Sequence, residues 1–331
     1  MIPFLLLEAW LRTGPIRYGP ESIPSSIPGV AYTYVPNKDY FHPVKPIHVN
    51  KWGTLGEDFP EKKDPGEFRV IVVGDSIVLS QHYFHTGFVK TLQKKFDADS
   101  PLPGRKFRFI QAGIASHGTC QEKQLIKHFY DGFAPDLIVM GYAVNDTEGP
   151  RVPFALDINT GKLKWWAWFW HFIKNRVRTL KWIKHHASPL IVRLRGPSEV
   201  VAPKEADPTD DVNYVLNMHK PAGGFWTRWK SCVGELGEYQ KEKKTPILFA
   251  IFPMLRPFHA EGLTDAYDRV EKTVRESGLT PLNLYPVFDA ANADEIMHGV
   301  DPMHLNQEGH DLVAKELGRV LRSNPALLIG R

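Results

Sequence analysis

Short, nearly continuous apolar runs alternate with helical stretches along this chain, and this alternation limits the fold more than any other feature. Four runs rich in β-branched or aromatic residues occupy 68–74, 107–113, 136–142 and 246–252, and a shorter one occupies 282–285. Such runs are typical of strands buried on both faces of a parallel sheet. Helix candidates lie at about 86–97, 119–131, 264–278 and 306–322. The sequence therefore predicts an α/β fold with right-handed βαβ units and a three-layer, doubly wound parallel sheet.

The alternation also divides the chain of 331 residues. Residues 1–67, rich in Pro and Gly from about residue 13, are expected to form an extended N-terminal arm over the core of a domain at 68–331. Between Asn145 and Pro246 the chain is far longer than a crossover requires, which predicts a cap insertion at about 150–245. Within it, 197–225 is interpreted as a polar loop and 225–243 as a helix.

Composition narrows the classes of function. With 43% hydrophobic and 24% charged residues the chain is that of a packed globular protein, and a net charge of +4 is too mild to indicate nucleic-acid binding. The sequence contains no glycine-rich nucleotide motif, so no cofactor is expected. Cys120 and Cys232 lie in no metal-binding spacing, and we expect a reduced, buried pair of thiols and no metal.

The N-terminal residues Met1 to Glu8 carry a short apolar run that Glu8 interrupts. The run lacks a basic segment before it and is far shorter than the ~20 residues of a membrane span. We therefore expect neither a signal peptide nor a spanning helix. The compartment stays open: cytoplasmic, or membrane-associated or periplasmic if an N-terminal segment is missing.

Polar residues follow the ends of the predicted strands. The first strand ends in Gly74-Asp75-Ser76, the second in Gly113, and the third leads to Asn145-Asp146. Asp301-Pro302-Met303-His304 precedes the last helix. Ligands of open α/β sheets bind beyond the carboxyl ends of the strands, so these residues are expected to meet at one edge.

Their chemistry fits nucleophilic catalysis. Ser76 would attack an acyl carbonyl, His304 would take and return its proton, and Asp301 would orient the imidazole. The backbone amides of Ser76 and Gly113 and the side-chain amide of Asn145 would bind the oxyanion. Taken singly, each residue has a plainer interpretation: Ser76 and Asp301 as helix caps, Asn145-Asp146 as a turn, His304 as a surface histidine.

Together, Gly74-Asp75-Ser76, Gly113, Gly141-x-x-x-Asn145-Asp146 and Asp301-x-x-His304 resemble the four ordered blocks of the SGNH/GDSL hydrolases. The resemblance covers about half of the chain. It implies a flavodoxin-like esterase or lipase with a Ser-His-Asp triad at Ser76, His304 and Asp301 and an oxyanion hole at Ser76, Gly113 and Asn145. One position departs from the family: the second block usually reads Asn-x-Gly, and here it is Gln111-Ala112-Gly113.

The predicted cap contains a basic, tryptophan-rich segment. Residues 158–198 hold nine Lys or Arg and no Asp or Glu, and five of the nine Trp residues of the chain lie there. Trp166 and Trp170 belong to one apolar stripe at helical spacing. Such a helix usually packs its stripe on the core, although 163–186 also suits peripheral contact with a membrane.

The sequence thus predicts a serine esterase or acylhydrolase that cleaves an O-acetyl, lipid or other ester without a cofactor. Asp75, His117, Trp166 and Trp170 are candidates for the substrate pocket. The partner would be a small-molecule, glycan or lipid ester, with no nucleic acid. Two alternatives remain open: an O-acyltransferase that acts on a glycan with the same triad, and a membrane-surface binding protein with a vestigial site.

Overall fold

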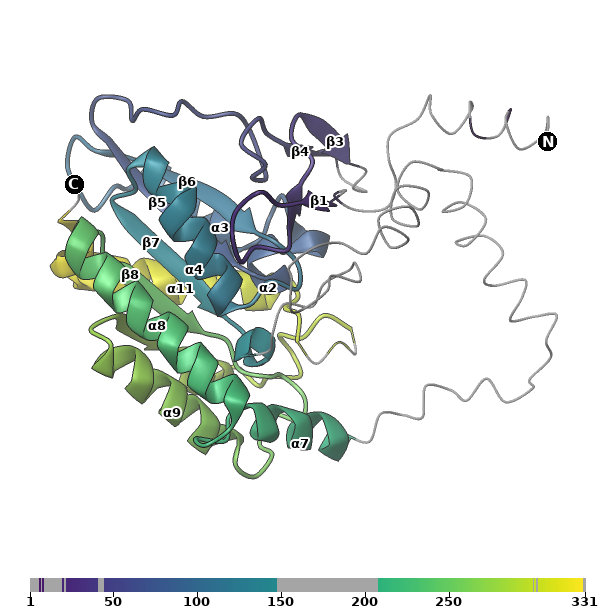
Figure 1. The fold of residues 1–331 in the computed structure, drawn as a ribbon. Coiled ribbons are helices and arrows are strands. Elements are labelled where there is room, and N and C mark those ends of the chain that lie inside the picture. Colours follow the sequence, from purple (N-terminus) through teal and green to yellow (C-terminus); the bar gives the residue numbers. More distant parts are fainter. Residues whose placement is uncertain are drawn as a thin grey trace.

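A five-stranded parallel sheet lies at the centre of the chain in a computed structural model (Figure 1). The structure describes residues 22–40, 45–147, 208–299, 301 and 303–329, besides Leu6, Glu8 and Pro20. The strands run in the order β6-β5-β7-β8-β9, which is the flavodoxin-like order 2-1-3-4-5. Their bounds match the predicted runs to within two residues: β5 (Glu67–Gly74), β6 (Lys106–Gly113), β7 (Leu137–Tyr142), β8 (Ile247–Ile251) and β9 (Thr280–Asn283).

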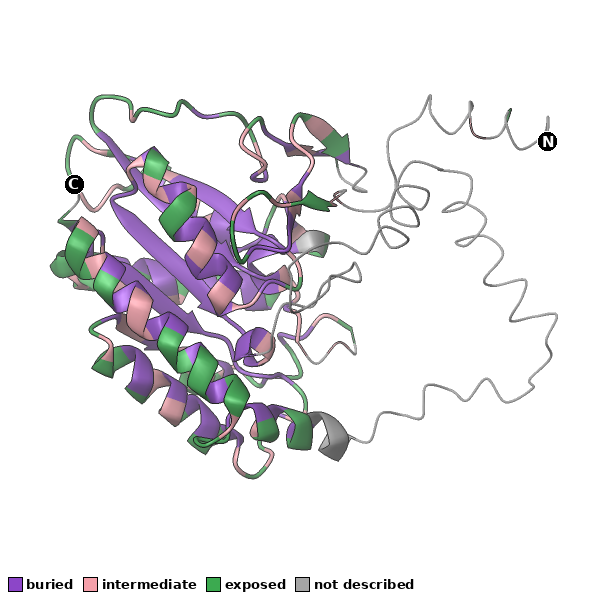
Figure 2. Cartoon of the chain, in the orientation of Figure 1, coloured by how far each residue is buried: buried purple, intermediate pink, exposed green. Residues whose placement is uncertain are grey.

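Helices cover both faces of the sheet, so the predicted three-layer α/β class is confirmed. One face carries α3 (Phe88–Ala98), α10 (Tyr285–Ala290) and α11 (Gln307–Ser323), and the other carries α4 (Thr119–His128), α8 (Gly224–Lys243) and α9 (Leu263–Glu276). Each layer has its own hydrophobic core, and the strands between them are buried (Figure 2). A sheet enclosed in this way requires strands that are apolar on both faces, which is why continuous apolar runs located them.

Shorter elements connect these layers. They are α2 (Ser76–Leu79), η1 (Gln81–Tyr83), η2 (Tyr130–Phe133), η3 (Val144–Thr147), α7 (Pro208–Met218) and η4 (Pro325–Leu328). The predicted loop at 197–225 is wrong over 208–218, where α7 buries Val212, Val215 and Met218 on the core. The Pro and Asp residues that suggested a loop lie at the start of this helix, where such residues are favourable.

The N-terminal arm carries two short antiparallel pairs, β1 (Ser22–Pro24) with β2 (Tyr32–Tyr34) and β3 (Lys38–Tyr40) with β4 (Ile47–Val49). One of its contacts with the edge strand β6 is a bridge in which the Leu55 amide donates to the Gln111 carbonyl at 3.2 Å. At the opposite end of the sheet the fully buried Arg69 guanidinium donates to the carbonyl oxygens of Pro60 and Glu61. Both contacts hold the arm against the domain.

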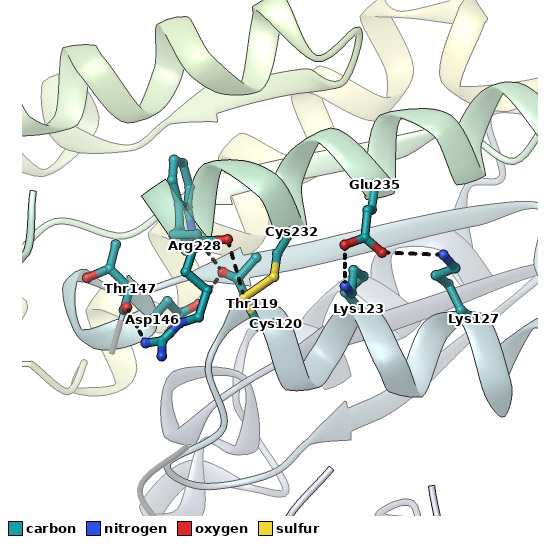
Figure 3. The surroundings of a disulfide bond; sticks show 10 residues. Thr119, Cys120, Lys123, Lys127, Asp146, Thr147, Arg228, Cys232 and Glu235 are labelled. Atoms are coloured by element: carbon teal, nitrogen blue, oxygen red, sulfur yellow. Dashed lines mark hydrogen bonds and ion pairs between the residues drawn. A yellow bond between two sulfur atoms is a disulfide. The ribbon is translucent and has the colours of Figure 1, made fainter. Parts of the chain in front are cut away.

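The two cysteines form a disulfide, and the expectation of reduced thiols is wrong. Cys120 in α4 and Cys232 in α8 are joined with their Cα atoms 5.3 Å apart, although 112 residues separate them (Figure 3). The sequence could not reveal this pairing, because only the packing of α4 beside α8 on the sheet brings the two positions together. Glu235, one turn further along α8, forms ion pairs with Lys123 and Lys127 of α4.

Much of the predicted cap, residues 148–207, lies outside the described residues. The tryptophan-rich segment 163–186, with Trp166 and Trp170, belongs to it, so its expected helix and its contacts stay predictions. Among the residues that the structure does describe, no helix is long and apolar enough to cross a membrane.

Candidate active site

Three glycines at the ends of neighbouring strands create the space in which Ser76 sits. Gly74 of β5 is the register partner of both Gly113 of β6 and Gly141 of β7. A Cβ atom at Gly74 or Gly141 would come within 2.3 or 2.6 Å of Val78 Cγ2, and one at Gly113 within 2.4 Å of a backbone nitrogen of α2. Because no side chain fits at these positions, α2 can rest directly on the strand ends with Ser76 at its first residue.

Ser76, His304 and Asp301 form a continuous relay. His304 Nε2 lies 2.8 Å from Ser76 Oγ, and His304 Nδ1 lies 2.7 Å from Asp301 Oδ2. The three side chains are partly exposed, so a substrate can reach them. This is the arrangement in which an imidazole accepts the serine proton at one nitrogen while a carboxylate fixes the other.

The charge of Asp301 is maintained by its own loop. Burial opposes its ionisation, but the Met303 amide, which donates to Oδ1 at 2.9 Å, and the neighbouring His304 together lower the pKa of the carboxyl group below its usual value. Asp301 is therefore a carboxylate at neutral pH and can stabilise an imidazolium at His304.

Asp75 lies between Ser76, the predicted nucleophile, and Asn145, the predicted oxyanion amide. It caps α2, since the Ile77 amide donates to its Oδ1 at 2.8 Å. Its Oδ2 lies 3.4 Å from Ser76 Oγ and 3.5 Å from Asn145 Nδ2. Asp75 is 2% exposed, and burial raises its pKa. Its carboxyl group thus lies beneath the site, where it orients Ser76 and Asn145 and has little surface left for a substrate.

Two tyrosines of the arm hold the loop that follows β6, and the sequence analysis missed them. Tyr32 donates its hydroxyl to the Ala115 carbonyl, and Tyr34 accepts from the Ala115 amide at 3.1 Å. Burial raises the pKa of Tyr32 to about 12, so this donor stays protonated. The alternating Tyr32-Thr33-Tyr34 pattern indicates a strand with two buried positions, but only the fold shows that they contact the loop after Gly113.

His117, a predicted pocket residue, lies under the same arm. Its ring is 1% exposed and packs edge-on against Tyr32, with Nε2 3.1 Å from the Tyr32 carbonyl. Burial lowers the pKa of His117 to about 4, so the ring is neutral. It supports the loop after β6 and has almost no surface with which to contact a substrate.

Buried carboxyl groups lie in and beside the turn that carries Asn145. Asp146 of η3 and Glu122 of α4 are both fully enclosed, and burial, aided by nearby acidic groups, raises the pKa of each well above its ordinary value. Thr119 lies between η3 and α8: its hydroxyl is 3.3 Å from Asp146 Oδ2 and accepts from Trp229 Nε1 at 3.1 Å. The raised pKa values disfavour negative charge on these two groups beside the expected oxyanion.

The loop that carries His304 is also held by contacts with η1. The His298 amide donates to the His304 carbonyl at 2.8 Å, and His298 Nδ1 lies 3.2 Å from the Tyr83 hydroxyl. His82 stacks on His298 with ring centroids 4.5 Å apart. These residues of η1 and the 297–305 loop were not singled out from the sequence as support for the triad, because no local pattern reveals contacts across 215 residues.

The structure therefore brings Ser76, Gly113, Asn145, Asp301 and His304 to the carboxyl edge of the sheet, where the sequence predicted that they meet. Trp166 and Trp170 lie outside the described residues. Within the described ranges, no group of three His, Cys, Asp or Glu side chains is placed to hold a metal ion.

Comparison with known proteins gives only distant similarities. No protein-family model and no curated protein matches the chain. Among solved structures, LAE5, an alpha/beta hydrolase enzyme from the metagenome of Lake Arreo, Spain, is 14% identical with a TM-score of 0.45 over 78% of this chain and 95% of that one. The acetyl xylan esterase AlAXEase (13%, TM-score 0.46, 76% and 99%) and TesA (13%, TM-score 0.46, 78% and 99%) are similarly distant.

At this distance the similarities do not indicate a function. The strand order and the geometry at the strand ends are more specific features of this chain. By those two features the chain resembles the SGNH hydrolases.

Proposed function

We propose that this protein is a serine esterase that hydrolyses a carboxylic ester through an acyl-enzyme on Ser76. The observation that carries the proposal is the relay in which His304 contacts Ser76 Oγ at 2.8 Å and Asp301 at 2.7 Å. A helix cap, a turn or a surface histidine, the plainer interpretations of these residues, does not require the three side chains to converge.

In the first half of the reaction, Ser76 Oγ attacks the ester carbonyl carbon and its proton passes to His304 Nε2. Negative charge develops on the carbonyl oxygen, where the amides of Ser76, Gly113 and Asn145 act as donors. The bond to the alcohol oxygen then breaks, and His304 returns the proton to the departing alcohol.

In the second half, a water molecule gives a proton to His304 and attacks the acyl carbon. The bond to Ser76 Oγ breaks, the serine regains its proton from His304, and the carboxylic acid leaves. If the hydroxyl of a second molecule replaced the water, the same steps would transfer the acyl group. Hydrolysis and transfer thus share one set of residues and differ in the acceptor.

The test uses a fluorophosphonate probe and p-nitrophenyl acetate. We expect the probe to label the wild-type chain and not Ser76→Ala, and hydrolysis to fall at least ~10³-fold in that variant. Asn145→Ala should retain labelling, since the nucleophile is intact, but lose about 10²–10³-fold in kcat. Ser80→Ala, a change at the other end of α2, is the control. An unlabelled, inactive wild-type protein would exclude the esterase.

The natural ester is addressed by a chain-length series of p-nitrophenyl esters. A preference for acetyl would favour a deacetylase acting on a glycan, and a preference for long chains would favour a lipid substrate. Added alcohol acceptors that yield a new ester in place of the free acid would favour the acyltransferase. A membrane-surface role depends on 163–186, and liposome flotation of Trp166→Ala and Trp170→Ala tests it.

The disulfide supports an oxidising compartment for this activity. Disulfides persist in secreted and periplasmic proteins and are rare where thiols are kept reduced. Cys120–Cys232 joins helices next to the turn that carries Asn145, so we propose that the enzyme works outside the reducing cytosol. Quantifying free thiols in protein purified from its native cells under alkylating conditions checks this.

A further inference from the structure

A cavity separate from the candidate active site lies along the outer edge of the sheet. It has a volume of about 490 Å³ and is lined by arm residues between 45 and 59, by Phe84 and His85, by helix α3 and by the first five residues of β6. This is the size of cavities that hold small organic ligands. The bridge between Leu55 and Gln111 lies beyond it toward Gly113, so the cavity occupies the half of β6 distant from the catalytic end.

The lining of the cavity is cationic. Lys45, Lys90, Lys94 and Lys106 all line it, and none of the four forms an ion pair with a carboxylate in the described part of the chain. Two carboxylates, Glu57 and Asp97, also line it and offset part of this charge. Arg108, a fifth cation of the lining, is already paired with Asp64 and Glu67.

Lys90 is the most enclosed of the four lysines. Its ammonium group lies 5.4 Å from the centre of the Phe84 ring, and burial lowers its pKa even though Glu57 acts in the opposite direction. Gly56 leaves room for it, since a Cβ there would come within 3.3 Å of Lys90 Nζ. A partly desolvated cation of this kind costs free energy, and an anion bound beside it would recover part of that cost.

The floor of the cavity is apolar. Phe84 and Phe59 line it but are only 2% and 4% exposed, so they offer almost no ring surface to a ligand. His85 fixes one rim, because its Nε2 lies 2.8 Å from the Lys45 carbonyl. A cationic lining above an apolar floor suits an organic ligand that carries several negative charges.

We propose that this cavity binds an acidic oligosaccharide, with one carboxylate or sulfate group at Lys90 and others at the exposed lysines of the lining, Lys45, Lys94 and Lys106. Such a site would hold an anionic glycan at a place distinct from Ser76. The proposal does not depend on esterase activity, since it concerns residues that the catalytic reaction does not use.

The test is binding of trigalacturonate to the full chain by isothermal titration calorimetry, with maltotriose as the uncharged probe and inorganic sulfate as the simple anion. We expect trigalacturonate to bind, more weakly as NaCl is raised, and maltotriose not to bind. Lys90→Gln should weaken binding at least tenfold and Lys94→Gln several-fold. Lys95→Gln, on the exposed side of α3 and outside the cavity, should leave it unchanged.

If sulfate bound as tightly as trigalacturonate, the ligand would not be an acidic oligosaccharide. If Lys90→Gln and Lys95→Gln bound trigalacturonate with equal affinity, the binding site would not be this cavity. The absence of any trigalacturonate binding at millimolar concentration would overturn the site. Thermal denaturation shows whether Lys90→Gln is folded, and Lys94→Gln, an exposed position, provides the second variant. Turnover of p-nitrophenyl acetate should be equal in all of these variants, so failure here is distinguishable from failure of the proposed function.

Discussion

Helices α3 and α11 pack on one face of the sheet mainly through apolar side chains, whereas α4 and α8 add a disulfide, ion pairs and buried carboxyl groups to the apolar core of the other face. The first face leads to His304, which precedes α11, and the second supports η3 with Asn145. Apolar packing is non-directional, but a disulfide and directed hydrogen bonds fix relative positions. We infer that the position of Asn145 depends on polar and covalent contacts, whereas the position of His304 depends on close packing of apolar side chains.

Removal of the disulfide should have the largest effect on stability. Closing a loop of about 100 residues stabilises a fold by up to ~4.7 kcal/mol in the chain-entropy account, so Cys120→Ala/Cys232→Ala should lower the free energy of unfolding by about that amount. Urea denaturation measures it. Dithiothreitol should reproduce the loss of stability in the wild type and change nothing in the double variant. If neither the double substitution nor dithiothreitol shifted the urea midpoint, the disulfide would not stabilise the α4/α8 face.

Truncation on the apolar face should destabilise without altering the chemistry. Leu317 of α11 is fully buried, so Leu317→Ala should cost about 3 kcal/mol through lost burial and a cavity. At a temperature where the variant is still folded, kcat on p-nitrophenyl acetate should stay within about twofold of wild type. A tenfold loss of kcat in the folded variant would show that this face also positions the reacting groups.

A matched polar change on the other face should affect both properties. Thr119→Val removes a hydroxyl that contacts Asp146 and Trp229, and leaving buried partners unsatisfied costs about 1–3 kcal/mol. Because η3 loses this support, we also expect a several-fold lower kcat with little change in KM. Thr227→Val, on the exposed side of α8, is the control, and equal kcat values in the two variants would contradict the expectation.

The smallest expected effect is a change in how steeply the free energy of unfolding varies with pH. Burial raises the pKa of Glu122, so the unfolded chain releases this proton near pH 4.5 while the folded chain retains it. The free energy of unfolding should therefore decrease as pH rises above that value, by at most ~1.4 kcal/mol per pH unit for one group. Glu122→Gln should make this decrease shallower, and Glu238→Gln, at an exposed position, should not.

Denaturation curves at several pH values between 4 and 8 measure the slope. Parallel curves for wild type and Glu122→Gln would mean that Glu122 ionises equally in the folded and unfolded chains. The buried carboxyl groups would then not distinguish the two faces.

Much of the fold could be predicted because a strand that is buried on both faces of a sheet must be apolar along its whole length, and such a run is visible in the sequence. Every strand of the central sheet coincides with an apolar run, and the long helices lie where the pattern changes period. Helix α7 was missed because its apolar positions lie among Pro and Asp residues that suggest a loop. The support from Tyr32, Thr119 and His298 was missed for a different reason, since each acts across more than 25 residues and leaves no local pattern.

The sequence by itself determined the strands, their βαβ order and the polar residues that follow them, because each depends on neighbours along the chain. Only the tertiary structure decided that Cys120 meets Cys232, that Asp75 and His117 lie beneath the site rather than open to substrate, and that four lysines share one cavity at the edge of β6. These facts depend on which helices and strands lie side by side, and packing between distant segments sets that.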